Sequence, residues 1–279
     1  QLKGFPNVDI DDIYIGNGVS EMISMSMQAL LDDGDESWSN AWPILFGQPA
    51  FSLAGGNAVH YVCDEKSNWY PDIDDIKSKI TSNTKAIVVI NPNNPTGSLY
   101  PKDVLEQIVD IARQNDLIIF ADEIYDRLVM DGKKHTAIAS LAPDVFCVSM
   151  NGLSKSHRIC GFRVGWMVLS GPKKNVKGYI EGLNMLANML ISVPTCSLST
   201  LFRLQLGGYQ SVDELLIPGG RIYEQREFIN EYRKTLFPGL SAVKQMQGFT
   251  SSLRLTVTCM ILKMMKNSVF VSWRRRRFS

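Results

Sequence analysis

Residues 86–97 read Ala86-Ile-Val-Val-Ile-Asn-Pro-Asn-Asn-Pro-Thr-Gly97, and this stretch decides the fold class. Its first five residues are continuously apolar and mostly β-branched, which is the pattern of a strand buried on both faces. The Asn-, Pro- and Gly-rich residues that follow end the strand in a turn. A strand of this kind belongs to a parallel sheet that is covered by helices on both sides.

The segments around this strand alternate between helical and extended patterns. Residues 102–114 have apolar side chains at helical spacing, and further helices are expected at 22–31, 173–189 and 221–236. Further buried strands are expected at 117–120, 145–149 and 164–169. We therefore predict an α/β fold with three layers, α/β/α, around a mainly parallel sheet.

Three polar clusters follow the predicted strands directly: Asn91 to Gly97, Asp122 to Tyr125, and Asn151 to Lys155. Ligands of parallel α/β sheets bind at the carboxyl ends of the strands. The sequence therefore predicts that these clusters meet in one site.

A fourth candidate segment lies near the beginning of the sequence. A short extended run over residues 11–15 leads into Gly16-Asn-Gly-Val-Ser-Glu21, and the predicted helix 22–31 follows. Backbone N–H groups at the start of a helix point at a bound anion, and glycine allows the anion a close approach. This layout is typical of a phosphate site.

The composition excludes several classes of protein. The chain has 279 residues, 45% of them hydrophobic, which is enough for one large domain and part of a second. Its five cysteines include no CxxC pair and its three histidines are scattered, so we expect neither a disulfide framework nor a metal site, and a cytoplasmic location is the default. We also expect no membrane partner, because no signal peptide or membrane-length apolar run is visible. With a net charge of +1, we expect no nucleic-acid partner either.

The motifs, taken together, resemble the large domain of class I/II aminotransferases, which are fold-type I enzymes that use pyridoxal phosphate (PLP). The resemblance runs from about residue 10 to residue 248 and is closest to the bacterial alanine (glutamate–pyruvate) aminotransferases. It rests on five features in the family's order: Gly16 to Glu21, Asn91 to Gly97, Ala121-Asp-Glu-Ile-Tyr125, Asn151-Gly-Leu-Ser-Lys155, and Arg163.

The resemblance implies roles for four residues around the ring of the cofactor. Lys155 would be the Schiff-base lysine and the base that moves the proton from the substrate Cα. Asp122 would pair with the pyridine nitrogen, which makes the ring an electron sink. Tyr125 and Asn94 would contact the phenolate oxygen, and Asn94 would also face the substrate. Each residue also has an ordinary structural interpretation, as a surface lysine, a strand-end turn residue, a core tyrosine or a turn asparagine.

The resemblance also implies a set of phosphate-binding residues. Gly18, Val19 and Ser20 would hold the phosphate with N–H groups and the serine hydroxyl, and Arg163 would supply a matching charge. Many relatives have a phosphate-binding serine three residues before the lysine, where this sequence has Gly152. Ser154 is therefore a less secure member of the set. Ser20 could also serve as a simple helix cap.

Three stretches depart from the family pattern: residues 37–49, 190–204 and 249–279. In the first, Ile44 falls where relatives place an aromatic ring against the cofactor. The third contains seven basic residues and no acidic ones and ends in four consecutive arginines, 274–277. For the first stretch we advance the hypothesis of two compensating frameshifts, and the last fits out-of-frame translation; the sequence does not decide whether the three stretches are frameshifts. A solvated basic tail, or binding of nucleic acid or lipid through Trp273 and the arginines, remains an alternative for the last one.

Parts of the family's enzyme are expected to be missing from this chain. They are the N-terminal arm, most of the small domain, and the arginine that binds the substrate α-carboxylate. We predict a partial PLP-binding large domain over residues 1–220, a connecting helix and the start of the small domain over 221–248, and a non-family tail over 249–279. The family implies a homodimer.

The function implied by the resemblance is transamination between alanine, or a similar amino acid, and 2-oxoglutarate or pyruvate. Three alternatives stay open: an inactive remnant of such an enzyme, a carbon–sulfur lyase or synthase of the same superfamily, and a nucleotide-binding α/β domain. The last lacks its motifs, since the sequence contains neither GxxxxGK[ST] nor GxGxxG.

Overall fold

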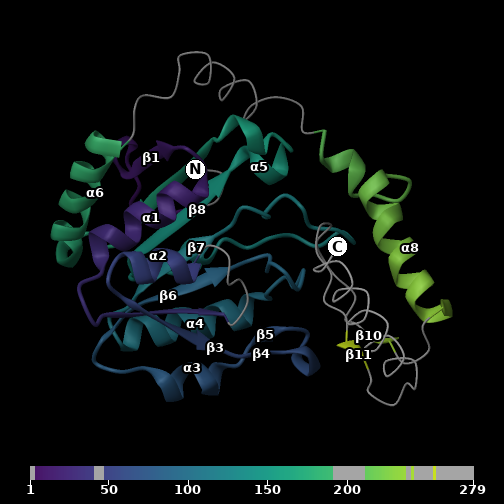
Figure 1. Ribbon diagram of the computed structural model, residues 1–279, viewed down its shortest axis with the longest axis horizontal. Coiled ribbons are helices and arrows are strands. Elements are labelled where there is room, and N and C mark those ends of the chain that lie inside the picture. The colour runs from purple at the N-terminus through teal and green to yellow at the C-terminus, as the bar shows by residue number, and fades with distance from the viewer. Residues whose placement is uncertain (1–3, 41–46, 191–210, 237–239, 242–253, 256–279) are drawn as a thin grey trace, which may run out of the picture.

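The computed structural model describes residues 4–40, 47–190, 211–236, 240–241 and 254–255 (Figure 1). Its strands are β1 (Ile13–Gly16), β2 (Glu36–Asn40), β3 (Asn57–Tyr61), β4 (Cys63–Asp64), β5 (Tyr70–Pro71), β6 (Thr84–Ile90), β7 (Ile118–Asp122), β8 (Cys147–Gly152), β9 (Gly165–Ser170), β10 (Leu240–Ser241) and β11 (Arg254–Leu255). Its α-helices are α1 (Val19–Leu30), α2 (Gly47–Leu53), α3 (Ile73–Lys79), α4 (Lys102–Gln114), α5 (Leu153–Ser156), α6 (Lys177–Leu190) and α8 (Arg221–Leu236). Short 3-10 helices are η1 (Ile10–Asp12), η2 (Glu65–Ser67), η3 (Ile138–Leu141), η4 (Cys160–Phe162), η5 (Lys174–Val176) and η6 (Asp213–Leu215).

The main sheet has seven strands in the order β1-β9-β8-β7-β6-β2-β3. The pairs from β8 to β3 are all parallel, whereas β9 runs antiparallel to both of its neighbours, β8 and β1. The predicted mainly parallel sheet is therefore confirmed. β9 differs in direction because the chain between β8 and β9 contains only the four-residue α5 and the three-residue η4. A parallel return needs a crossover over the sheet, usually through a longer helix.

Helices cover both faces of the sheet, which confirms the three-layer α/β/α architecture (Figure 1). Successive side chains of a strand point to opposite faces. Ile87 and Val89 of β6 accordingly pack in the cluster that includes α3 and α4. Ala86 of the same strand packs in the other cluster, which includes α1, α2 and α6. Burial on both faces explains why these strands are uniformly apolar.

The predicted helices overlap the observed ones, although α1 begins at Val19, three residues before the predicted start at residue 22. α4 spans Lys102–Gln114, and its buried side chains are Leu105, Ile108, Val109, Ile111 and Ala112. α8 spans Arg221–Leu236 as predicted. α6 begins at Lys177 and not at residue 173, because η5 occupies Lys174–Val176. The short strands β2 and β3 were not predicted, since neither is a continuous apolar run.

A third, smaller apolar cluster joins α8 and the segment before it to the chain that follows β7. It consists of Ile124, Tyr125, Leu128, Met130, Val212, Leu216 and Ile222. Beside it, the Arg226 guanidinium donates two hydrogen bonds, of 2.9 and 2.7 Å, to the carboxylate of Asp131. These contacts attach α8 next to the predicted site.

Several predictions concern residues outside the described ranges. They are the aromatic position at Ile44, nearly all of the aberrant stretch 190–204, and the arginines 274–277. Within the described part of the chain, no helix is both long and apolar enough to cross a bilayer.

Candidate active site

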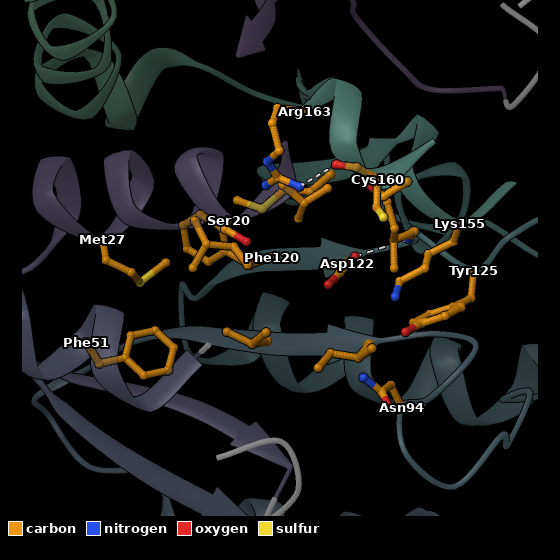
Figure 2. Close-up of a pocket in the computed structure, with 17 residues that line it drawn as sticks. Ser20, Met27, Phe51, Asn94, Phe120, Asp122, Tyr125, Lys155, Cys160 and Arg163 are labelled. Carbon is orange, nitrogen blue, oxygen red and sulfur yellow. Dashed lines mark hydrogen bonds between the residues drawn. The ribbon is translucent and has the colours of Figure 1, made fainter. Parts of the chain in front are cut away.

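Eight of the nine residues predicted to hold the cofactor line one pocket of about 260 Å³ (Figure 2). They are Val19, Ser20, Asn94, Asp122, Tyr125, Ser154, Lys155 and Arg163. The ninth, Gly18, lies against the side chain of Arg163. The pocket lies at the carboxyl ends of the parallel strands β6, β7 and β8, where the topology predicted it.

Asp122 is the last residue of β7 and faces the middle of the pocket (Figure 2). Burial raises the pKa of its carboxyl to about 6, and the charge of Glu123 also raises it. The N–H of Ile124, which donates to Asp122 Oδ1 at 3.1 Å, and the charge of Lys155 act in the opposite direction. A cationic group placed next to this buried carboxyl would stabilise its ionised form.

Tyr125 and Lys155 lie together at one end of the pocket (Figure 2). Tyr125 is buried in the turn after β7, and burial raises the pKa of its hydroxyl to about 12, helped by the charge of Asp122. Lys155 is on α5, directly after β8, with its Nζ over the Tyr125 ring at 5.6 Å from the centroid. The phenol therefore remains a hydrogen-bond donor at neutral pH, beside the amine.

The loop after β6 carries Asn94 into the opposite wall of the pocket (Figure 2). Its neighbours are fixed by buried hydrogen bonds. The Asn91 Oδ1 accepts from the Tyr100 N–H at 2.9 Å, and the Asn93 Oδ1 accepts from the Thr96 hydroxyl at 2.8 Å. The first asparagines of the motif thus hold the loop, while Asn94 is presented to the cavity.

On the side of the pocket across from Asn94, Arg163 lies beside the start of α1 (Figure 2). Gly18 is the N-cap of α1 and has a φ of 86°, a conformation that favours glycine. The Arg163 Nη2 donates to the Asn17 carbonyl at 3.1 Å, and its Nη1 donates to the Cys160 carbonyl at 3.0 Å. The N–H groups of Gly18 and Glu21 donate to the carbonyls of Gly16 and Gly18. A guanidinium beside the N–H groups of Val19 and Ser20 is a suitable arrangement for binding a phosphate.

Close backbone packing explains the glycine at position 152. Gly152 pairs with Gly165 of β9, and a Cβ on Gly152 would lie 2.7 Å from the Val164 carbonyl oxygen. A Cβ on Gly165 would lie 2.5 Å from both the Gly18 carbonyl carbon and the Val19 nitrogen. Gly152, Gly165 and Gly18 therefore allow β8, β9 and the first turn of α1 to approach each other closely. A serine at 152 does not fit this packing.

The remaining lining is mainly apolar and was not predicted. It comprises Ile23, Met27, Phe51, Val88, Ile90, Phe120, Ile124, Met150 and the one thiol, Cys160. Figure 2 shows Phe51 and Met27 at the end of the pocket opposite to Lys155. Strand residues such as Val88, Ile90 and Phe120 alternate toward the same face, and that alternation is the signal that could have identified them. Among the described lining residues, Arg163 is the single arginine.

Sequence and structure comparisons agree on the family. Residues 6–264 match the family described as "Aminotransferase class I and II". The chain is 55% identical over 248 residues to the "Glutamate-pyruvate aminotransferase AlaA" of Haemophilus influenzae, covering 88% of this chain and 60% of that protein. It is 49% identical over 247 residues to the "Alanine aminotransferase" of Mycobacterium tuberculosis, covering 87% of this chain and 56% of that protein.

Solved structures lead to the same result. An aminotransferase from Escherichia coli superimposes with a TM-score of 0.85 at 53% identity, covering 88% of this chain and 61% of the other. The alanine aminotransferase from Pyrococcus furiosus has a TM-score of 0.83 at 34% identity, with coverages of 92% and 64%. This chain thus spans about 60% of the length of its relatives. By sequence and by fold, it belongs to the class I and II aminotransferases.

Proposed function

We propose that this chain carries the cofactor site of a PLP-dependent aminotransferase acting on alanine, or a similar amino acid, and 2-oxoglutarate or pyruvate. The observation that carries the proposal is the convergence of Lys155, Asp122 and Tyr125 in one pocket that is also lined by Arg163 and the start of α1. The printed names of the relatives, glutamate–pyruvate and alanine aminotransferase, support the choice of substrates.

The residues of the pocket fit PLP by their chemistry. Lys155 offers an amine for the aldehyde, and the buried Asp122 offers a carboxyl for the pyridine nitrogen. Tyr125 and Asn94 offer donors for the phenolate oxygen, and Arg163 with Ser20 and the Gly18–Val19 peptide suits the phosphate. Ser154 lines the same pocket and would add a hydroxyl. When bound, PLP supplies an electron sink for the charge that develops on the substrate Cα.

Asp122 and Tyr125 set the charges around the ring. Because burial raises its pKa, the Asp122 carboxyl holds a proton more firmly than an exposed aspartate does. A protonated pyridine nitrogen facing Asp122 would stabilise the ionised carboxylate, and the carboxylate would in turn keep that nitrogen protonated. The Tyr125 hydroxyl, with a pKa of about 12, keeps its own proton and donates a hydrogen bond.

Lys155 moves the proton of the reaction. Its Nζ would take up the proton from the substrate Cα and later release it, as a general base and then a general acid. The buried Tyr125 ring under the amine and the apolar walls, such as Ile124 and Met150, keep water from this position. Asn94 would orient the substrate from the opposite wall.

The proposal includes the architecture of the chain and its partners. Residues 1–220 would form the large domain and 221–248 the connection to the small domain. The non-family tail expected at 249–279 overlaps the family match, which runs to residue 264, and its residues 254–255 pair with β10. The partners would be an amino acid, a 2-oxo acid and a second copy of the chain, because the family implies a homodimer. A carbon–sulfur lyase or synthase is not favoured, since similar relatives are named glutamate–pyruvate aminotransferase and alanine aminotransferase.

Absorbance titration of the purified chain with PLP tests the proposal. We expect a visible band that is retained in Lys102→Ala, a lysine on the surface of α4, and lost in Lys155→Ala. Addition of alanine should bleach the band, and 2-oxoglutarate should restore it. A folded chain without a Lys155-dependent band would contradict the cofactor site. A band that alanine leaves unchanged would mean that the chain is an inactive remnant.

A further inference from the structure

We propose that Glu21 is a positioning residue that preforms the phosphate end of the pocket by holding Asn17. The inference rests on the proposed function, since it concerns binding of the cofactor's phosphate. Glu21 does not line the pocket, and its carboxylate contacts the loop from behind.

The contact between Glu21 and Asn17 is made by two hydrogen bonds. The Asn17 backbone N–H donates to Glu21 Oε2 at 2.7 Å, and the Asn17 side-chain amide donates to Glu21 Oε1 at 3.1 Å. Glu21 is the third residue of α1, the position from which a carboxylate reaches back to the residues before the helix. Its negative charge is also favourable in the first helical turn.

Asn17 is held on its other side by Arg163. The Asn17 carbonyl accepts a hydrogen bond from Arg163 Nη2 at 3.1 Å, so Glu21 and Arg163 hold the two backbone polar groups of the same residue. The next peptide, Gly18–Val19, packs against Gly165, where no Cβ can be accommodated. The loop is therefore fixed at Asn17 and supported at Gly18.

The glycine at position 16 makes room for this arrangement. A Cβ on Gly16 would lie 2.5 Å from Glu21 Oε2. Glu21 accepts from the N–H of Asn17, while the Glu21 N–H itself donates to the Gly18 carbonyl at 3.2 Å. The N–H groups of Val19 and Ser20, at the start of α1, are those that would face a bound anion. A carboxylate close to a phosphate site is unfavourable by charge alone, so its benefit must come from the geometry that it imposes.

Charge repulsion and loop positioning predict opposite effects of removing the Glu21 carboxylate on phosphate binding, so a measured affinity distinguishes them. Pyridoxine 5′-phosphate and pyridoxine differ only in the phosphate and form no Schiff base, so their affinities report the phosphate end of the pocket independently of Lys155. We would measure both by titration calorimetry on the full chain and on Glu21→Ala, Glu21→Gln and Glu106→Ala. Glu106 is an exposed residue of α4 paired with Lys102, so it is a matched control.

In Glu21→Ala, the affinity for pyridoxine 5′-phosphate should fall about tenfold, as expected for the loss of charge-assisted hydrogen bonds. Glu21→Gln keeps one acceptor for the Asn17 N–H and should lose roughly threefold, because a neutral bond is about half as strong. The affinity for pyridoxine should be unchanged in both, and Glu106→Ala should match the unaltered chain. The ratio of the two affinities also corrects for any unfolded fraction.

Two results would overturn the proposal. Tighter binding of pyridoxine 5′-phosphate in both Glu21 variants would show that the carboxylate only repels the phosphate. Equal changes for the two ligands would show that Glu21 has a general structural role. Failure of the proposed function would give a different result. The Lys155-dependent band with PLP would be absent, while pyridoxine 5′-phosphate would still bind more tightly than pyridoxine.

Discussion

The Lys155 amine lies over the face of the Tyr125 ring, 5.6 Å from its centroid. The two residues come from different segments: Lys155 from α5, which follows β8, and Tyr125 from the turn after β7. Because β7 and β8 are parallel neighbours, their carboxyl ends bring the two side chains together. The ring and the hydroxyl of Tyr125 can be removed separately by substitution, so the contribution of each can be measured.

Tyr125→Phe keeps the buried ring and removes the hydroxyl. We expect the free energy of unfolding to change by less than about 1.5 kcal/mol, while the affinity for PLP falls several-fold. Tyr125→Ala also empties the ring's site and should cost about 3 kcal/mol. Urea denaturation and PLP titration measure the two effects. Tyr70→Phe, at a tyrosine that does not line the pocket, should change neither; equal PLP affinity in Tyr125→Phe would argue against a hydroxyl contact.

Asp122 predicts a pH dependence of stability in the cofactor-free chain. Its folded pKa is raised from 3.8 to about 6, so the folded state binds more protons than the unfolded state between these values. By linkage, this residue contributes stability at low pH that is lost as the pH rises to about 6. The shift corresponds to roughly 3 kcal/mol at most. Asp122→Asn should therefore be more stable than the unaltered chain at pH 7, and the difference should shrink toward pH 4.

Urea denaturation at several pH values checks this expectation. Asp116→Asn, at an exposed aspartate in a turn, is the matched control and should run parallel to the unaltered chain. A stability difference for Asp122→Asn that does not vary with pH would contradict the sign derived above. In the same variant, we expect PLP to bind more weakly, because the carboxylate for the pyridine nitrogen is gone.

Gly165→Ala should move the start of α1. A Cβ at this position would lie 2.5 Å from backbone atoms of Gly18 and Val19, which cannot shift without displacing the helix. We expect a loss of about 2 kcal/mol in stability, as in overpacked cores, and weaker binding of PLP. Gly178→Ala is the control, since nothing lies within 4 Å of its Cβ position and it is in α6. That change should be neutral or slightly stabilising, by up to about 1 kcal/mol. Thermal melts compare the two; similar melts would refute the packing argument.

The pair Arg226–Asp131 should be important for the attachment of α8. Arg226 is 5% exposed and makes a two-pronged contact with Asp131, so Arg226→Ala leaves a carboxylate without its main cation. We expect a loss of about 2 kcal/mol, below the range for a fully buried pair because the Asp131 side chain is partly exposed. Arg226→Lys should recover only part of it, since lysine lacks the planar fork.

A surface arginine is the matched control for this change. Arg113 is exposed and pairs with Asp110 and Asp144 at the surface, so Arg113→Ala should have little effect. Chemical denaturation of the unaltered chain, Arg226→Ala, Asp131→Asn and the variant that combines both changes gives the coupling energy between the two side chains. A coupling near zero would mean that the apolar cluster around Ile124 and Leu216 alone attaches the helix.

The elements that could be predicted are those whose signal is local. The helix at residues 102–114 was predicted to the residue because its apolar side chains recur at helical spacing. The strands β6, β7 and β8 were recognised because they are buried on both faces and therefore uniformly apolar. The strands β2 and β3 were not predicted, because neither has a continuous apolar run. β2 contains Ser and Asn residues, and β3 is partly exposed.

The amino-acid sequence by itself determined the fold class, because the buried strands carry a local apolar pattern, and its motifs, through their resemblance to the aminotransferase family, supplied the candidate cofactor residues. The tertiary structure alone decided three features: the direction of β9, the close packing of Gly152 and Gly165 beside Gly18, and the hydrogen bonds of Glu21 and Arg163 to Asn17. These features depend on backbone contacts between segments distant in sequence. Such contacts leave no periodicity along the chain, so only the folded arrangement brings them together.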